Sequence, residues 1–128
     1  MDGIVLSLDA ITAALRAAWS SQTSAADGWS RENPAAGQCA VTALVLQDYL
    51  GGTIMRNEIN GHPNYFLCLD DGTEIDLARE QFGEIRDITE GEPRDKYRVL
   101  RYPGTQRRYE ILRSALAAVA AAAPFLAQ

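Results

Sequence analysis

The sequence predicts a single α+β domain, residues 1–128, in which helices precede and follow an antiparallel sheet of three or four strands. Apolar residues recur at helical spacing near both ends of the chain. Between these ends, short segments of β-forming residues are separated by Asn-Gly and Asp-Gly turn signals. Hydrophobic residues make up 47% of the chain and charged residues 23%, which suits a globular core with a solvated surface. The expected order of elements is therefore α-α-β-β-β-α.

The first predicted helix spans residues 8–20, with Ser7 as its N-cap. Its apolar stripe consists of Leu8, Ile11, Leu15, Ala18 and Trp19. A loop rich in Ser, Ala, Asn, Pro and Gly follows over residues 20–37. The second predicted helix, Cys39–Leu50, is apolar on nearly every side and ends before a Gly-Gly pair. We therefore expect it to be the central buried helix.

Three strands are predicted after this helix, over Thr53–Ile59, 64–69 and 73–77. The Asn60-Gly61 pair joins the first two strands, and Asp70-Asp71-Gly72 joins the second to the third. Each connection is too short for anything but an antiparallel hairpin. The three segments therefore predict an antiparallel meander.

The rest of the chain predicts a long connection and one more helix. Residues 78–97 are polar and charged and contain Gly83, Gly91 and Pro93, which indicates an extended surface connection with room for one short helical turn. The last helix is expected to begin near Thr105 and to pack back on the core. Its apolar stripe consists of Tyr109, Leu112, Leu116, Val119 and Ala123.

Cys39 stands at the start of the second predicted helix, in the stretch Gly37-Gln38-Cys39. The first N–H groups of a helix lack partners inside the helix, and the helix dipole places partial positive charge there. A thiol at that point is favoured as the thiolate, which is the nucleophilic form. The side chain of Gln38 can supply a donor for a developing oxyanion. The stretch therefore predicts a cysteine-centred site.

Two long stretches of the chain resemble the YunG-like family of small, poorly characterised bacterial proteins. They are residues 33–52 (NPAAGQCAVTALVLQDYLGG) and residues 71–82 (DGTEIDLAREQF), and the resemblance extends to residues 102–105 and to Arg108-Tyr109. It identifies a family and implies no substrate. The layout is also similar to the core of papain-like and transglutaminase-like proteins, in which a Cys opens a helix packed on an antiparallel sheet and His and Asp follow on neighbouring strands.

The second resemblance implies roles for individual residues. Cys39 corresponds to the nucleophile, Gln38 to the oxyanion donor and Asp76 to the carboxylate that orients the His. The family pattern has a His directly before an aromatic pair on the middle strand, where this chain has Asn64. The only histidine of the chain, His62, lies two residues earlier, about 6–7 Å along an extended strand.

The turn between the last two predicted strands decides which side chains share a face. A two-residue loop at Asp71-Gly72 places Leu67 opposite Asp76 and turns Asn64 to the other face. A three-residue loop with Gly72 in the left-handed region places Phe66 opposite Asp76. A Cys–His–Asp site requires the three-residue loop, and we predict that register.

Two functions follow as hypotheses. In the first, the protein is a cysteine-dependent hydrolase or acyl transferase acting on an amide, thioester or isopeptide bond, with His62 as the base and no metal or organic cofactor. In the second, it is an inactive relative whose cleft binds a peptide or a partner protein, because Asn64 cannot accept a proton at neutral pH. Free cysteines are also often plain buried apolar residues. The expected cleft residues are Trp29, Asn64, Phe66 and Arg79.

Charge and hydropathy limit the partners. The formal net charge of −5 argues against binding nucleic acid, and the pair Arg107 and Arg108 is interpreted as solvated surface. The N-terminus has no basic region typical of a signal peptide, and the apolar tail, residues 115–127, is too short to span a membrane. We therefore expect a cytoplasmic protein with free thiols at Cys39 and Cys68. The Ala-rich last helix is an alternative surface for forming a homo-oligomer.

Overall fold

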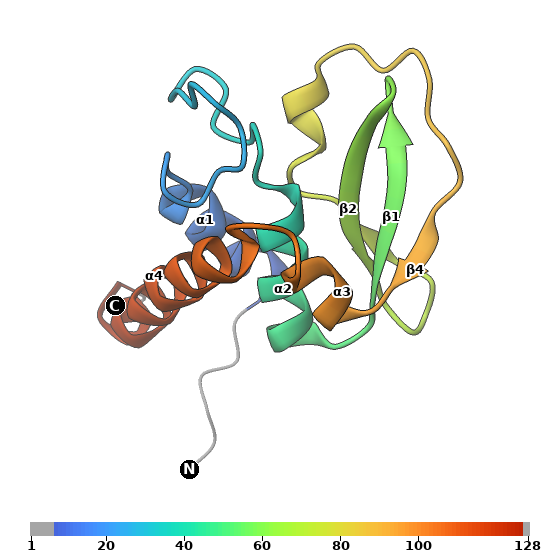
Figure 1. Cartoon of the computed structure of the whole chain (residues 1–128). Helices are drawn as coiled ribbons and strands as arrows, with labels where there is room; N and C mark the ends of the chain where they lie inside the picture. Colours follow the sequence, from blue (N-terminus) through green and yellow to red (C-terminus); the bar gives the residue numbers. More distant parts are fainter. Residues whose placement is uncertain (1–6, 127–128) are drawn as a thin grey trace.

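The computed structural model describes the backbone of residues 7–126 and the side chains of residues 7–119. Within this range the chain is an α+β fold with a four-stranded antiparallel sheet of order β3-β2-β1-β4, as predicted (Figure 1). The elements are α1 (Leu8–Ala18), α2 (Cys39–Leu50), β1 (Thr53–Ile59), β2 (His62–Cys68), β3 (Glu74–Ile75), the 3₁₀ helix η1 (Arg79–Phe82), β4 (Glu92–Arg94), α3 (Lys96–Leu100) and α4 (Thr105–Leu126).

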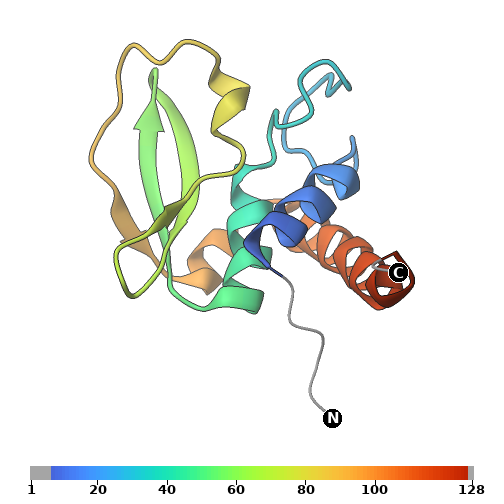
Figure 2. The ribbon, with the colours of Figure 1, turned by 180° about the vertical axis from the view of Figure 1, so that it is seen from behind.

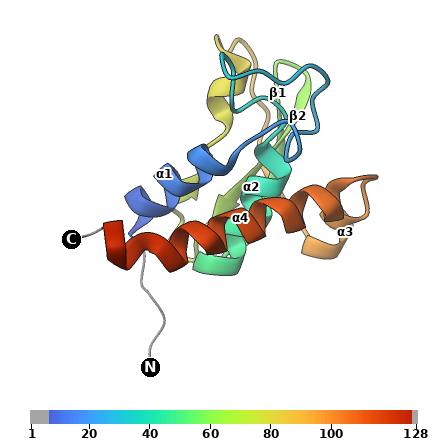
Figure 3. The same cartoon turned by 90° about the vertical axis from the view of Figure 1, so that its left-hand side faces the viewer.

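The helix α2 lies at the centre of the molecule. It contacts β1 and β2 on one side and α4 on the other, and α1 packs against α4 behind it (Figures 2 and 3). Six consecutive residues of α2, from position 41 to position 46, are buried. A helix buried on all sides must be apolar on all sides, as the sequence of α2 is. This arrangement confirms the predicted central helix.

The helix α1 begins where predicted and ends two residues earlier. The Oγ of Ser7 accepts a hydrogen bond from the N–H of Ala10 at 3.1 Å, which is the expected N-cap. Ile11, Leu15 and Trp19 are buried, but Leu8 is 42% exposed. Leu8 lies in the first turn of α1 and does not contribute to the core, so this part of the predicted stripe is wrong.

The β1–β2 hairpin is tighter than predicted. Asn60 and Gly61 both have positive φ, at 53° and 80°, and form a two-residue turn. The ladder therefore starts at the turn, with His62 paired to Ile59 and Pro63 to Glu58. As a result β2 begins two residues before its predicted start.

The β2–β3 connection has the predicted three-residue form. The N–H of Leu69 donates to the carbonyl of Thr73 at 2.8 Å, and Gly72 has a φ of 91°. Leu67 pairs with Ile75, so Phe66 stands opposite Asp76 in the same register. The strand β3 itself is only two residues long, shorter than the predicted 73–77.

The polar segment 78–97 is more structured than predicted. It contains η1, the edge strand β4, which pairs with β1, and the start of α3. The Oδ1 of Asn60 accepts hydrogen bonds from the N–H groups of Arg86 and Asp87, and this side chain holds the segment to the hairpin. Short charged elements of this kind have no hydrophobic periodicity, so the sequence pattern could not reveal them.

The helix α4 starts at Thr105 as predicted. Tyr109, Leu112 and Leu116 are buried, and Val119 packs partly against the same core. The last member of the predicted stripe, Ala123, lies outside the described side chains. None of the described helices combines the length and the apolar character needed to cross a bilayer.

Candidate functional site

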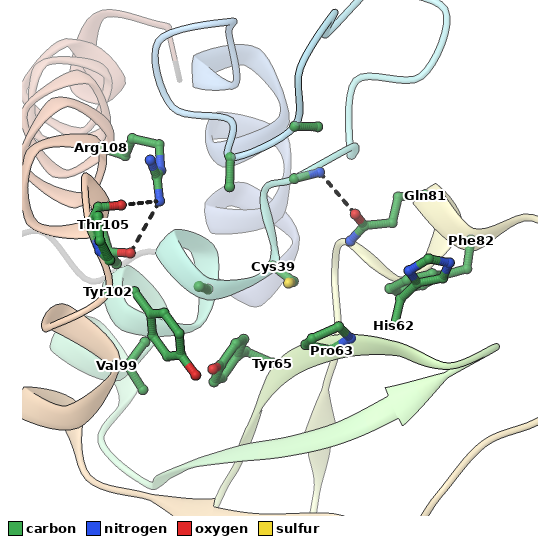
Figure 4. Close-up of a pocket in the computed structure, with 15 residues that line it drawn as sticks. Cys39, His62, Pro63, Tyr65, Gln81, Phe82, Val99, Tyr102, Thr105 and Arg108 are labelled. Carbon is green, nitrogen blue, oxygen red and sulfur yellow. Dashed lines mark hydrogen bonds between the residues drawn. The ribbon is translucent and has the colours of Figure 1, made fainter.

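A cavity of about 660 Å³ lies where the start of α2, the strand β2, η1 and the α3–α4 turn meet (Figure 4). The loop before α2 forms its remaining wall. Two of the predicted site residues, Cys39 and His62, line it. A partly enclosed cavity of this size is typical of a site for a small ligand or a short peptide segment.

Cys39 is the first residue of α2 and is partly exposed on the cavity wall. Burial raises the pKa of its thiol above the ordinary value, and the negative charge of Asp76 raises it further. Hydrogen bonding from the backbone of Tyr65 and Ala40 and from the side chain of Gln81 acts in the opposite direction, but burial is the largest effect. The thiol is therefore protonated at neutral pH, unlike the thiolate that the helix start predicts.

Gln38 is fully buried and does not line the cavity. Its Oε1 accepts a hydrogen bond from the Oγ1 of Thr23 at 2.8 Å, and its Nε2 donates to the carbonyl of Ser20 at 3.1 Å. The N-cap residue has a helical backbone conformation that turns this side chain toward the loop after α1. The Nε2 that was expected to supply an oxyanion donor is therefore bound to a protein carbonyl, outside the cavity lining.

Gln81 of η1 is the amide that lies at the cysteine instead. Its Oε1 accepts from the N–H of Gly37 at 2.9 Å, and its Nε2 donates to the carbonyl of Ala78 at 3.0 Å. Gln81 thus joins η1 to the start of α2 across the cavity (Figure 4). Position 81 belongs to the stretch of family resemblance, but only the fold brings it next to Cys39.

Gly37 holds the loop that enters α2. It has a φ of 70°, and a Cβ at this position would lie 2.3 Å from the backbone nitrogen of Ala26 and 2.5 Å from the Oγ of Ser24. Its carbonyl accepts from the N–H of Ala25 at 2.9 Å. Only glycine allows this close backbone approach, so Gly37 determines where Cys39 stands.

Asp76 is bound by two of the predicted site residues. Its Oδ2 accepts hydrogen bonds from the Nδ2 of Asn64 and from the Nε of Arg79, both at 2.9 Å. Asn64 is fully buried and also donates to the Oδ1 of Asn57 at 3.1 Å. Among the described residues, Asn64 Oδ1 and Asp76 Oδ1 are buried without a hydrogen-bond partner. These residues form a packed polar cluster, and neither Asn64 nor Arg79 lines the cavity.

His62 is exposed and lies beside Phe82 at one end of the cavity (Figure 4). The register places it on the same strand face as Asn64, and Asn64 bonds to Asp76. Within the described part of the chain, the donors to Asp76 Oδ2 are Asn64 and Arg79. His62 is therefore not among the residues that bind Asp76, and Asn64 and Arg79 share the Oδ2 of that carboxylate.

Two further predicted cleft residues lie elsewhere. Trp29 donates from its Nε1 to the carbonyl of Pro34 at 2.9 Å and stabilises its own loop. Phe66 is buried close to Gly91 and Met55. Neither residue lines the cavity, because one is taken up by the loop and the other packs under the β4 side of the sheet.

The opposite end of the cavity is formed by the α3–α4 turn and carries Arg108. The Nη2 of Arg108 donates to the Oγ1 of Thr105 at 3.1 Å and to the carbonyl of Pro103 at 3.5 Å. Arg108 is half-buried on the cavity wall, so its interpretation as solvated surface is wrong. Between the two ends, Tyr65 and Tyr102 face each other (Figure 4). Burial, reinforced by Tyr102, raises the pKa of Tyr65.

The family model described as YunG protein matches residues 7–121 of the chain. A curated relative, the uncharacterized protein YunG of Bacillus subtilis (strain 168), is 38% identical over 68 residues. This match covers 53% of the chain, and the chain spans just over half, 56%, of the length of that relative. No solved structure matches the chain.

Proposed function

This chain belongs to the YunG protein family, and we propose that it is a non-catalytic protein with a papain-like or transglutaminase-like core, whose cavity binds a peptide segment. One observation carries the proposal. Asn64 donates to Asp76 Oδ2 from the strand position at which a catalytic His would be oriented. The acid of a Cys–His–Asp arrangement is therefore present, and an amide takes the place of the base.

The arrangement of elements supports the papain-like part of the proposal. A cysteine begins the helix α2, which packs on an antiparallel sheet. Asn64 lies on the next-to-edge strand β2, and Asp76 follows the edge strand β3. This order along the chain and across the sheet is similar to the order of cysteine, His and Asp in the core of those enzymes, and it supports the proposal.

The electrostatics at Cys39 oppose nucleophilic catalysis. A thiol attacks a carbonyl as the thiolate, which needs either a lowered pKa or a nearby base. Here burial raises the pKa of the Cys39 thiol and Asp76 adds to that effect. An amide such as that of Asn64 cannot take the proton. Cys39 is therefore treated as part of the cavity wall.

The cavity itself is suited to binding. Its walls combine apolar and aromatic side chains with a small number of polar groups at the two ends, which is the usual composition of a ligand site. Tyr65, Phe82, Val99 and Tyr102 supply the apolar and aromatic surface. A peptide segment offers both the side chains for that surface and the backbone groups for the polar ends.

The test is the rate at which iodoacetamide alkylates Cys39, measured by intact mass in a Cys68→Ser chain. We expect Cys39 to react more slowly than a free thiol at pH 7. The rate should rise steadily with pH past 9, and His62→Ala should leave it unchanged. A fast reaction that levels off near neutral pH, and that His62→Ala removes, would contradict the proposal.

A second candidate is the cysteine-dependent hydrolase or acyl transferase, with His62 as its base. It is favoured by one observation, that Cys39 and His62 line the same cavity. It requires the imidazole to approach the sulfur to within about 3 Å. The alkylation experiment separates the two functions, and so does peptide binding: a binding protein keeps its affinity in Cys39→Ser, whereas an acyl-enzyme intermediate is lost.

A further inference from the structure

Arg108 has a place in the cavity that the proposed function leaves without a role. It lies in the first turn of α4 and lines the cavity at the end opposite His62 (Figure 4). Between Arg108 and the far end lie the aromatic walls of Tyr65 and Tyr102. A ligand that fills the cavity therefore ends at a guanidinium group.

The guanidinium is held in a fixed position. Its Nη2 donates to the Oγ1 of Thr105 at 3.1 Å and to the carbonyl of Pro103 at 3.5 Å. Gly104 has a φ of 80°, and a Cβ there would lie 2.5 Å from the Nη1 of Arg108. The turn before α4 is thus shaped around this side chain, so little ordering remains to be done when a ligand arrives.

Within the described part of the chain, the charge of Arg108 has no acidic partner. Among the described residues, five arginines have a carboxylate oxygen within 4 Å: Arg16, Arg56, Arg79, Arg86 and Arg94. The other described arginines are exposed to solvent, except Arg108, which is half-buried. Its Nε is buried and has no acceptor. The Nη1 likewise makes no hydrogen bond with the described residues, so the guanidinium keeps donors that these residues do not use.

We propose that Arg108 binds the C-terminal carboxylate of a peptide whose last side chain packs against Tyr65 and Tyr102. A guanidinium and a carboxylate form charge-assisted hydrogen bonds, and the Nη1 of Arg108 makes no hydrogen bond with the described residues, because Thr105 and Pro103 are bound through Nη2. The start of α4 adds partial positive charge at the same end of the cavity. A terminal carboxylate fits better than an acidic side chain because Arg108 lies at an end of the cavity. This inference rests on the proposed function and names its ligand class.

The experiment titrates the full chain, labelled with ¹⁵N, with three probes: N-acetylphenylalanine, its C-terminal amide, and N-acetylaspartylphenylalanine amide. The Nε–H resonance of Arg108 is followed by NMR, and that of Arg79, which already donates to Asp76, is the internal control. We expect N-acetylphenylalanine to shift the Arg108 resonance and to bind about 10–100-fold more tightly than its amide. The Arg79 resonance should not move.

Two variants complete the test. Arg108→Gln removes the charge and should bring the affinity for N-acetylphenylalanine down to that of the amide, while Arg108→Lys should restore part of it. Thermal unfolding checks that each variant is folded. Equal binding of acid and amide, unaffected by Arg108→Gln, overturns the role of Arg108 and leaves the peptide-binding function standing. If the aspartyl probe binds more strongly than N-acetylphenylalanine, the preference of Arg108 for a C-terminal carboxylate is overturned. If no probe binds, both the role of Arg108 and the peptide-binding function are overturned.

Discussion

The two ends of the cavity use their polar groups differently. At the thiol end, defined by Cys39 and Gln81, the amide of Gln81 bonds to protein groups and the thiol keeps its proton. At the arginine end, defined by Thr105 and Arg108, a cation keeps a buried N–H without an acceptor. The thiol end thus has a cysteine at a helix start but a protonated thiol, whereas the arginine end has hydrogen-bond donors that are free to bind a ligand.

Gly37→Ala should have the largest effect, because it disrupts the backbone of the loop that positions Cys39 at the thiol end. The new Cβ would meet three backbone or side-chain atoms of residues 24–26 at 2.3–2.8 Å, at a φ of 70°. We expect the free energy of unfolding to fall by about 3 kcal/mol in chemical denaturation. Gly28→Ala is the matched control, since Gly28 has the same φ and nothing within 4 Å, and should cost about 1 kcal/mol. Equal losses in the two variants would show that backbone strain alone acts at position 37.

Asn64→His should convert the thiol end toward catalysis and so sharpen the comparison. The Nδ1 of His can replace the Nδ2 of Asn64 as donor to Asp76, which leaves the ring able to accept a proton. We expect the alkylation rate of Cys39 at pH 7 to rise about tenfold or more. Asn64→Ala, which removes the amide without adding a base, should give no such gain. No increase in Asn64→His would mean that Cys39 and position 64 are not placed as a nucleophile and its base.

The free energy of unfolding at high pH should show whether the Cys39 thiol is protonated in the folded chain. The folded chain has a raised pKa at Cys39, so the stability that this group contributes is full below its ordinary pKa of 9.0 and is lost as pH rises through the raised value. The difference in free energy of unfolding between the chain and its Cys39→Ser variant should therefore decline above pH 9, by about 1.4 kcal/mol for each pH unit by which the pKa in the folded chain exceeds 9.0. Tyr65 and Tyr109 also have raised pKa values, but both proteins contain them. A constant difference up to pH 11 would argue against a buried thiol.

Tyr109→Phe should have the smallest effect, because Tyr109 does not line the arginine end and only helps to hold α4, the helix that carries Arg108. The hydroxyl of Tyr109 donates to the Oδ2 of Asp48 at 2.5 Å and ties α4 to α2. We expect a loss of about 1 kcal/mol in the free energy of unfolding and an unchanged affinity for N-acetylphenylalanine. A loss of affinity as large as that of Arg108→Gln would mean that the position of α4, and not the charge, controls binding.

Local chemistry made the central parts of the fold predictable. The apolar sequence of α2 and the Asn60-Gly61 turn each specify one structure, whereas the turn at Asp70-Asp71-Gly72 allows two loop lengths. The register that places Asn64 beside Asp76 is predicted because the resemblance to a Cys–His–Asp site requires it, and the structure has that register. The helix and the first turn depend on neighbours in the sequence, so a single chain contains the information.

The rest of the site depends on contacts between distant segments. The direction of the Gln38 side chain is decided by Thr23 and Ser20, and the place of Gln81 by its contact with Gly37. Arg108 follows Arg107 in the sequence, and only the turn around Gly104 brings it to the cavity. Patterns of charge along the chain do not contain these contacts.

The sheet also has a consequence for the behaviour of the protein at high concentration. Its outer strands are β3, with two residues, and β4, with three residues that include Pro93. An outer strand with free N–H and C=O groups is a template on which other chains can add strands and start fibrils. Both edge strands are very short, and β4 carries a proline between Glu92 and Arg94. They offer little such template, so the fold is protected against self-association through its sheet.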